Sequence, residues 1–176
     1  MKKTIKWVVS VILLSIFIAS CDDKTSNYDN YDSWKKENDE YFATLRASGR
    51  YEILSIPTNR GGGELLIKKL ASGHPDSIPP IFNSTILCHY KGWNKNDSVF
   101  DKSFEGDQPT WDDTPATIPL ANVVKGFNEM LQQMVSGDKY EVVIPWELGY
   151  GDSGSGKILP FTTLHFEVEL IKVLRH

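Results

Sequence analysis

Two adjacent valines and a distant tyrosine are the residues whose types and order first suggest a binding site. Val123 and Val124 stand immediately before a short apolar segment, and Tyr150 lies in a loop that is rich in glycine. An apolar helix, a glycine stop at Gly137 and an alternating strand separate them, and this order can bring the three side chains around one apolar hollow. A hollow of this kind suits a ring such as that of a prolyl residue.

The segments around these residues are predicted to form several strands and one short helix. Residues 125–135 have the apolar spacing of a helix, and Ser136-Gly137 can end it. The last strand, 163–174, alternates: positions 166, 168 and 170 are expected to face the core, and His165 with its charged neighbours to face solvent. Antiparallel strands around one helix indicate the α+β class, and a half-open sheet is the simplest cover for that helix. The other predicted strands are residues 51–57, 64–70, 85–90, 98–103 and 139–144.

Four segments between residues 84 and 174 carry a resemblance to a known family. They are Cys88–Gly92, Val99–Ser103, Val123–Phe127 and the stretch from Ile144 to Leu170, which contains Gly149-Tyr150-Gly151. In this order they resemble the FK506-binding (FKBP) type of peptidyl-prolyl cis-trans isomerase. The resemblance implies a half-open antiparallel sheet around one short helix. It also implies an enzyme without metal or cofactor that rotates Xaa–Pro bonds in unfolded or proline-containing polypeptides, and that macrolides of the FK506 or rapamycin type can inhibit.

The resemblance also assigns roles to individual positions. Phe100, Asp101 and Tyr150 would be the catalytic residues, with the Tyr150 hydroxyl holding a carbonyl of the bound peptide and Asp101 close to the rotating amide. The rest of the substrate pocket would be formed by Tyr90, Val123, Val124, Phe127, Ile158 and Phe166.

Two departures from the family pattern affect the expected activity. Phe127 stands where the family usually has a tryptophan, so the pocket floor is expected to sit lower. The loop from Gly151 to Ile158 is one residue shorter than in common members, and Ser155 stands about where a histidine often does. The alternative is therefore a catalytically weak binding or chaperone module that holds apolar or proline-containing client segments.

Each pocket residue also has a simpler interpretation. Phe100 and Phe166 alternate inward on strands and could be core residues, and Asp101 could cap a turn. Only their joint order favours a pocket. A protease is excluded, although Gly151-Asp152-Ser153-Gly154 matches a trypsin-like nucleophile segment. The preceding histidines are His74 in a turn-rich loop and His89 on a predicted strand, and the chain is too short for a double barrel.

The first 20 residues predict an export signal. Three lysines precede an apolar run that is too short to span a bilayer comfortably, and the run ends in Ile18-Ala19-Ser20-Cys21. This ending resembles a bacterial lipobox, in which Cys21 becomes the lipidated N-terminus; an ordinary signal peptide is the alternative. Acyl chains on Cys21 would attach the protein to a membrane of the cell envelope, on the periplasmic face or the cell surface.

The predicted chain has four parts. Residues 1–20 form the leader, and the polar residues 21–31 form a tether. Residues 32–83 form an extra N-terminal helix, which Asp32 or Ser33 can cap, followed by a β-hairpin. Residues 84–176 form the isomerase-like domain.

The charge of the chain is acidic. The net charge is −4. Without the first 20 residues, the chain has 16 basic and 23 acidic side chains, which gives a net charge of −7. This balance argues against nucleic acid or anionic lipid headgroups as partners. Cys88 lies in an apolar run and is expected to be a buried, unreactive core residue.

Overall fold

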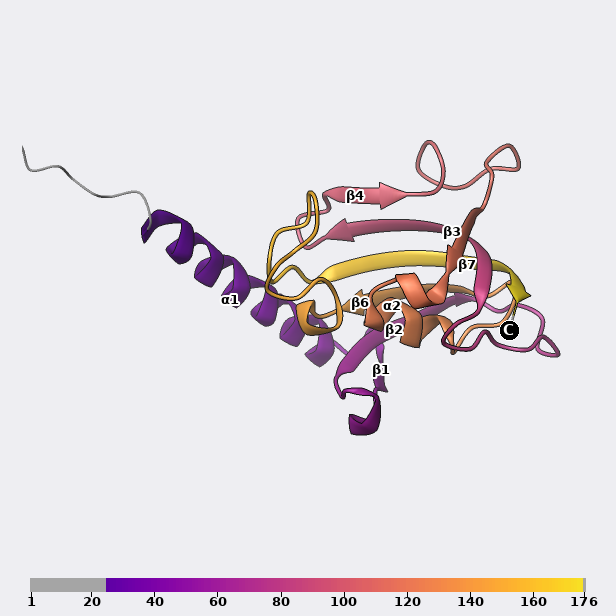
Figure 1. Ribbon diagram of the computed structural model, residues 1–176, viewed down its shortest axis with the longest axis horizontal. Coiled ribbons are helices and arrows are strands. Elements are labelled where there is room, and N and C mark those ends of the chain that lie inside the picture. The colour runs from indigo at the N-terminus through magenta and orange to yellow at the C-terminus, as the bar shows by residue number, and fades with distance from the viewer. Residues whose placement is uncertain (1–24, 176) are drawn as a thin grey trace, which may run out of the picture.

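The computed structural model describes residues 25–175, with side chains described for residues 31–174. The predicted leader and Cys21 lie outside the described residues. Helix α1 (Thr25–Ala47) is followed by a seven-stranded antiparallel sheet and the short helix α2 (Lys125–Leu131) (Figure 1). This is the α+β fold with an extra N-terminal helix that the sequence predicted.

The sheet has the strand order β1-β2-β6-β7-β3-β4, and β5 pairs with the same edge of β3 as β4 does. Because β2 pairs with β6, the N-terminal hairpin is continuous with the sheet of the isomerase-like domain. Short 3-10 helices occupy three connections: η1 (Thr58–Arg60), η2 (Leu120–Asn122) and η3 (Trp146–Leu148). The strands are β1 (Glu52–Ser55), β2 (Glu64–Ala71), β3 (Thr85–Asn94), β4 (Val99–Lys102), β5 (Ala116–Pro119), β6 (Lys139–Ile144) and β7 (Leu164–Arg175).

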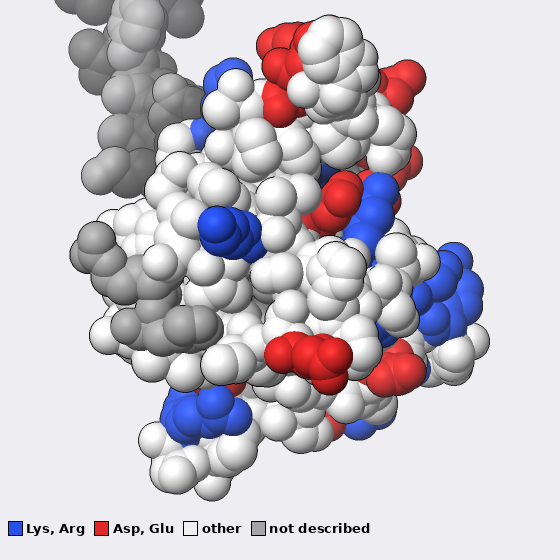
Figure 2. Space-filling model, turned by 90° about the vertical axis from the view of Figure 1, so that its right-hand side faces the viewer, with Lys and Arg blue, Asp and Glu red and all other residues white. Residues whose placement is uncertain are grey.

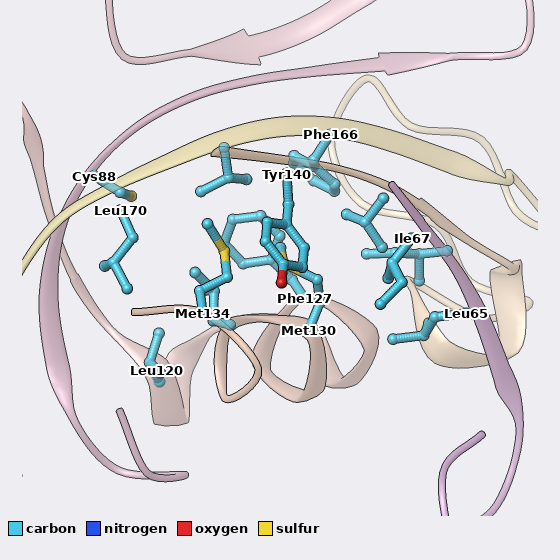
Figure 3. Close-up of a cluster of buried hydrophobic side chains, with 14 of the residues drawn as sticks. Leu65, Ile67, Cys88, Leu120, Phe127, Met130, Met134, Tyr140, Phe166 and Leu170 are labelled. Carbon is cyan, nitrogen blue, oxygen red and sulfur yellow. The ribbon is translucent and has the colours of Figure 1, made fainter. Parts of the chain in front are cut away.

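The concave face of the sheet packs on α2. Phe127, Met130 and Met134 project from α2 and the turn after it toward the apolar side chains of the strands (Figure 3). Gly126 permits the close approach of this helix, since a Cβ there would lie 2.5 Å from Ile144 and 2.9 Å from the Leu65 side chain. The alternating inward residues of β7 are buried as predicted.

Part of the opposite face of the sheet is covered by α1. Leu45 packs on Leu66 and Val143, which point away from α2. His165 is also on this face, but it is buried at 3% exposure between Tyr41 of α1 and Trp93 of β3. The prediction that His165 faces solvent is therefore wrong, because alternation identifies the face of a strand but not whether another element covers it.

Several elements differ from the sequence predictions, and three differences concern the helices and a missed strand. Helix α1 begins at Thr25, so residues 25–31, assigned to the tether, are helical. The sequence of residues 25–31 has no apolar periodicity, so it gave no sign of a helix, although helix propensity does not exclude one there. In Figure 1 the first turns of α1 project beyond the sheet. Residues 116–119, which none of the predicted strands included, form β5, and α2 ends at Leu131 rather than at residue 135.

The described surface carries both signs of charge. Figure 2 shows acidic and basic side chains interspersed among uncoloured ones on one face, with no continuous basic patch among the residues that it colours. Within residues 25–175, no helix is both long and apolar enough for a membrane span.

Candidate active site

Four aromatic rings form a continuous row between α2 and three strands. Phe127 of α2 lies 4.7 Å from Phe166 of β7 and 6.4 Å from Tyr90 of β3, measured between ring centroids. Phe166 in turn meets Phe100 of β4 edge to face at 5.5 Å. Edge-to-face and tilted contacts of this kind stabilise aromatic clusters beyond their buried area. The structure thus brings together four residues that the sequence placed in one pocket.

Gly92 makes the end of this row possible. It pairs with Asp101 of β4 on one side and with Phe166 of β7 on the other. A Cβ at position 92 would lie 2.5 Å from the Phe100 ring and 2.7 Å from the Phe166 ring. Only glycine lets rings from two flanking strands meet over the middle strand. Gly92 ends the segment Cys88–Gly92 that carries part of the family resemblance, but the sequence alone did not predict that two rings would pack over it.

Tyr90 and Asp101 are joined across β3 and β4. The Tyr90 hydroxyl donates a hydrogen bond to Asp101 Oδ2 at 2.7 Å. Burial and this bond both raise the pKa of Tyr90 well above its ordinary value, so the phenol stays protonated as a donor. Ser103 holds the same corner, because its Oγ accepts a hydrogen bond from the Tyr90 N–H at 2.9 Å. Asp101 is thereby fixed in orientation while it remains exposed.

An open cleft of about 210 Å³ lies over the Phe100 end of this row. Tyr150 stands on its rim and is 37% exposed. Burial of the ring and the nearby Asp101 carboxylate raise the pKa of the Tyr150 hydroxyl, which therefore remains a hydrogen-bond donor. The cleft is lined by Phe100, Asp101, Tyr150, Ser155, Lys157, Ile158 and Phe166.

Val123 and Val124 lie at the helix side of the same apolar cluster. Both are half-buried and pack against it, and Val124 is the residue before the first turn of α2. Asn128 fixes this segment, because its buried Nδ2 donates to the carbonyl oxygens of Leu120 at 2.6 Å and Phe82 at 2.9 Å. The sequence analysis missed Asn128, since a polar residue in an apolar helix gives no local signal of its partners.

The site is not the largest hollow of the molecule. A hollow of about 470 Å³ lies between α1, the glycine turn 61–63 and η3, and none of the predicted site residues lines it.

Trp111 is 93% exposed and does not line the cleft. Within the described part of the chain, no group of three or more His, Cys, Asp or Glu side chains is arranged to hold a metal ion.

Sequence comparisons relate the chain to FKBP-type isomerases, the family that the residues of the site resemble. The model of the FKBP-type peptidyl-prolyl cis-trans isomerase family matches residues 80–171, a little over half of the chain. An FK506-binding protein of Neisseria meningitidis serogroup A is 38% identical over 112 residues, which are 63% of this chain and 97% of that protein. The macrophage infectivity potentiator of Trypanosoma cruzi is 28% identical over 174 residues, covering 94% of this chain and 82% of the relative.

Solved structures give the same result. The chain superposes on FkpA from Escherichia coli with a TM-score of 0.69 and 28% identity, covering 86% of this chain and 66% of that one. It also matches a peptidyl-prolyl cis-trans isomerase of Pseudomonas syringae with a TM-score of 0.64 and 28% identity, covering 81% of this chain and 94% of that one. With its row of aromatic rings and its Tyr90–Asp101 pair, the chain belongs to the family of FKBP-type peptidyl-prolyl cis-trans isomerases.

Proposed function

We propose that this isomerase acts on Xaa–Pro bonds of folding proteins in the cell envelope, to which a lipid on Cys21 attaches it, and that the cleft around Phe100 is where the bond rotates. The observation that carries the catalytic part is the meeting of Phe100 and Phe166 beneath an open cleft that Tyr150 and Asp101 border. This cleft offers a prolyl ring an apolar floor and offers the adjoining peptide two polar groups.

A cleft with an apolar floor and a polar rim can catalyse this rotation without a covalent step. The barrier to rotation of an amide is about 18–20 kcal/mol, because the twist breaks the resonance of the C–N bond. The planar amide separates more charge than the twisted amide does. When a prolyl ring covers Phe100 and Phe166, less water reaches the planar amide beside it, so binding there favours the transition state over the ground state.

The polar groups at the rim are proposed to orient the peptide. The Tyr150 hydroxyl, held protonated, can donate to a carbonyl oxygen beside the proline and hold the chain bent. Asp101, fixed by the Tyr90 hydroxyl at 2.7 Å, places a carboxylate near the rotating bond. A macrolide of the FK506 type would occupy the same cleft and compete with the peptide.

Refolding of a protein whose slow step is prolyl isomerisation tests this function. We expect the wild-type protein to accelerate that step, and Phe100→Ala and Tyr150→Phe to reduce the acceleration. Phe82→Ala is the matched control, because it removes a phenyl ring that is 62% exposed and does not line the cleft. Full acceleration by Phe100→Ala, or equal loss in Phe82→Ala, would contradict the assignment.

A weakly catalytic holding module is the second candidate, and Phe127 is the observation that favours it. Phe127 is only 3% exposed beneath Tyr90 and Phe166, and it offers no indole N–H at the floor. Binding of an unfolded, proline-containing client by the wild-type protein without faster refolding would support this candidate. Phe127→Trp would then be expected to increase the acceleration.

Attachment to the envelope is tested with the two cysteines. Cells that express the full chain are labelled with radioactive palmitate and then fractionated. We expect the label and membrane association to be lost in Cys21→Ser and kept in Cys88→Ala, the matched control in which the other cysteine is removed. Equal labelling of the wild-type chain and Cys21→Ser would refute the lipid anchor.

A further inference from the structure

The loop between β6 and β7, residues 145–163, carries Tyr150 and Ile158 of the cleft and is attached to α1 at both ends. This attachment is not explained by packing of the sheet alone, since the apolar contact of α1 is made elsewhere, by Leu45 on Leu66 and Val143. Polar contacts from Trp34, Asn38 and Asp39 of α1 instead reach the beginning and the end of the loop.

The beginning of the loop is held through Trp146. Its indole Nε1 donates to Asp39 Oδ1 of α1 at 2.8 Å. Asp39 is also paired with Lys35 at 2.6 Å, and the Lys35 ammonium lies 5.1 Å from the centroid of the Trp146 ring. Phe161, near the other end of the loop, packs edge to face on Trp146 at 5.0 Å. One side of α1 therefore contacts both ends through this pair of rings.

The end of the loop is held through buried polar groups. Asn38 is fully buried, and its Oδ1 accepts a hydrogen bond from the Thr163 N–H at 2.8 Å. The Trp34 indole donates to Thr162 Oγ1 at 3.1 Å, and this hydroxyl donates to the Leu159 carbonyl oxygen at 2.8 Å. Buried hydrogen bonds of this kind fix a backbone more strongly than exposed ones, since their loss leaves groups unpaired.

Inside the loop, these contacts lead directly to Tyr150. Phe161 has a φ of +59°, a backbone conformation that residues other than glycine rarely adopt. Contacts with the surrounding residues must therefore stabilise it. In this conformation its N–H donates to the Gly151 carbonyl oxygen at 2.9 Å. The Gly151 N–H in turn donates to the Trp146 carbonyl oxygen at 2.9 Å. Tyr150 thus precedes a residue whose backbone is hydrogen-bonded to the backbone of Trp146 and Phe161, the two residues whose rings α1 contacts.

We propose that α1 is a positioning element of the active site: Trp34, Asn38 and Asp39 hold the loop in the conformation that places Tyr150 and Ile158 at the cleft. The inference rests on the proposed function of that cleft. It assigns a role in catalysis to residues that touch neither the peptide nor the reacting bond.

Asp39 provides the sharpest test, because it is exposed and its substitution leaves the buried core intact. Asp39→Ala removes the acceptor of the Trp146 indole, whereas Asp39→Asn keeps an oxygen at that place and is the rescue variant. Arg46→Ala is the matched control on the same helix, since it breaks the Arg46–Glu64 pair at 2.7 Å, away from the loop. Asn38→Ala tests the buried contact and is compared with the others at equal folded fraction.

Two measurements on the full chain distinguish positioning from general stability. Isomerisation of an Xaa–Pro peptide gives kcat/KM, and hydrogen exchange by NMR follows the amides of Gly151, Gly154, Ile158 and Phe161, all of which are hydrogen-bonded within the loop. For Asp39→Ala we expect kcat/KM to fall about fivefold, as for loss of one net hydrogen bond. We also expect faster exchange in the loop but not in β3 or β7, and recovery of both in Asp39→Asn.

Wild-type kcat/KM and loop exchange in both Asp39→Ala and Asn38→Ala would overturn the positioning role. An equal loss of activity in Arg46→Ala would overturn it as well. If Tyr150→Phe lost activity while the two α1 variants did not, the proposed function would stand without the positioning role. If Tyr150→Phe kept full activity, the role proposed for Tyr150 at the cleft would fail, and loop exchange would still decide whether α1 holds the loop.

Discussion

Protonation of His165 is expected to weaken the fold at mildly acidic pH. Its ring is 3% exposed, lies between Tyr41 and Trp93 at centroid distances of 5.5 and 5.4 Å, and makes no hydrogen bond within the described residues. Burial lowers the pKa of His165 from 6.5 to about 4, although the carboxylate of Asp97 acts in the opposite direction. The folded protein therefore holds the imidazole neutral at a pH where the unfolded chain binds a proton.

The magnitude follows from the two pKa values. The stability that His165 contributes is fully present above pH 6.5, the value in the unfolded chain, and is lost progressively as the pH falls toward 4. Since one pKa unit corresponds to about 1.4 kcal/mol, the whole loss is roughly 3 kcal/mol, of which about 2 kcal/mol is lost between pH 7.5 and 5. For a protein of this size, the loss of about 2 kcal/mol between pH 7.5 and pH 5 corresponds to a fall of about 4–8 °C in Tm.

Urea unfolding at pH 7.5 and pH 5 measures this effect. His165→Phe keeps a ring between Tyr41 and Trp93 but cannot be protonated, so it is expected to lose about 2 kcal/mol less than the wild-type protein over the same interval. His74→Gln is the control, because it removes an exposed histidine that has no contact with Tyr41 or Trp93. Identical losses in the wild-type protein and His165→Phe would refute the reasoning.

Three further predictions concern the cleft and the core. Gly92→Ala should destabilise the protein by roughly 1–3 kcal/mol, because the new methyl group displaces the two phenyl rings of the cleft; unchanged macrolide binding and unchanged Tm would contradict this. Asp138→Ala should lower the free energy of unfolding by roughly 2–4 kcal/mol, since Asp138 is 1% exposed and pairs with Lys69 at 2.8 Å. Burial alone would raise the pKa of Asp138, but the hydrogen bonds from Lys69 and two backbone N–H groups outweigh burial and lower the pKa below 3.8. The stability that Asp138 contributes should therefore be lost only as the pH falls below 3.8. A complete loss of this contribution already at about pH 5 would contradict the prediction. Burial raises the pKa of the Cys88 thiol to about 12, so in a Cys21→Ser variant a thiol reagent should modify Cys88 only after unfolding, and rapid labelling of the native protein would be the contrary result.

Much of the site could be predicted from the sequence because the resemblance to the FKBP family assigned its residues, and local patterns agree with that assignment. Alternation placed Phe100 and Phe166 on the inner face of strands, and the apolar spacing of residues 125–135 placed Phe127 on a helix. What the sequence did not contain was the covering of surfaces by distant segments. His165 lies on the face that alternation predicts for it, but burial of that face depends on α1, far away in the sequence.

The contacts that hold the site were equally invisible. The acceptors of the Asn128 amide are backbone oxygens whose positions depend on how η2 meets α2. The Asn38–Thr163 contact joins residues 125 positions apart, and neither residue type signals its partner. Strand β5 was missed because it has only four residues, follows Pro115 and ends in Pro119, and is therefore too short to show a period.

Two-dimensional exchange NMR on an Xaa–Pro tetrapeptide measures catalysed rotation directly, without a folding client that the protein could also bind. We predict cis–trans exchange peaks at catalytic concentrations of the wild-type protein, their loss on addition of FK506, and a rate lower by on the order of tenfold or more in Phe100→Ala. Absence of exchange peaks with folded wild-type protein, or an equal rate in Phe100→Ala, would contradict the assignment of catalysis to this cleft.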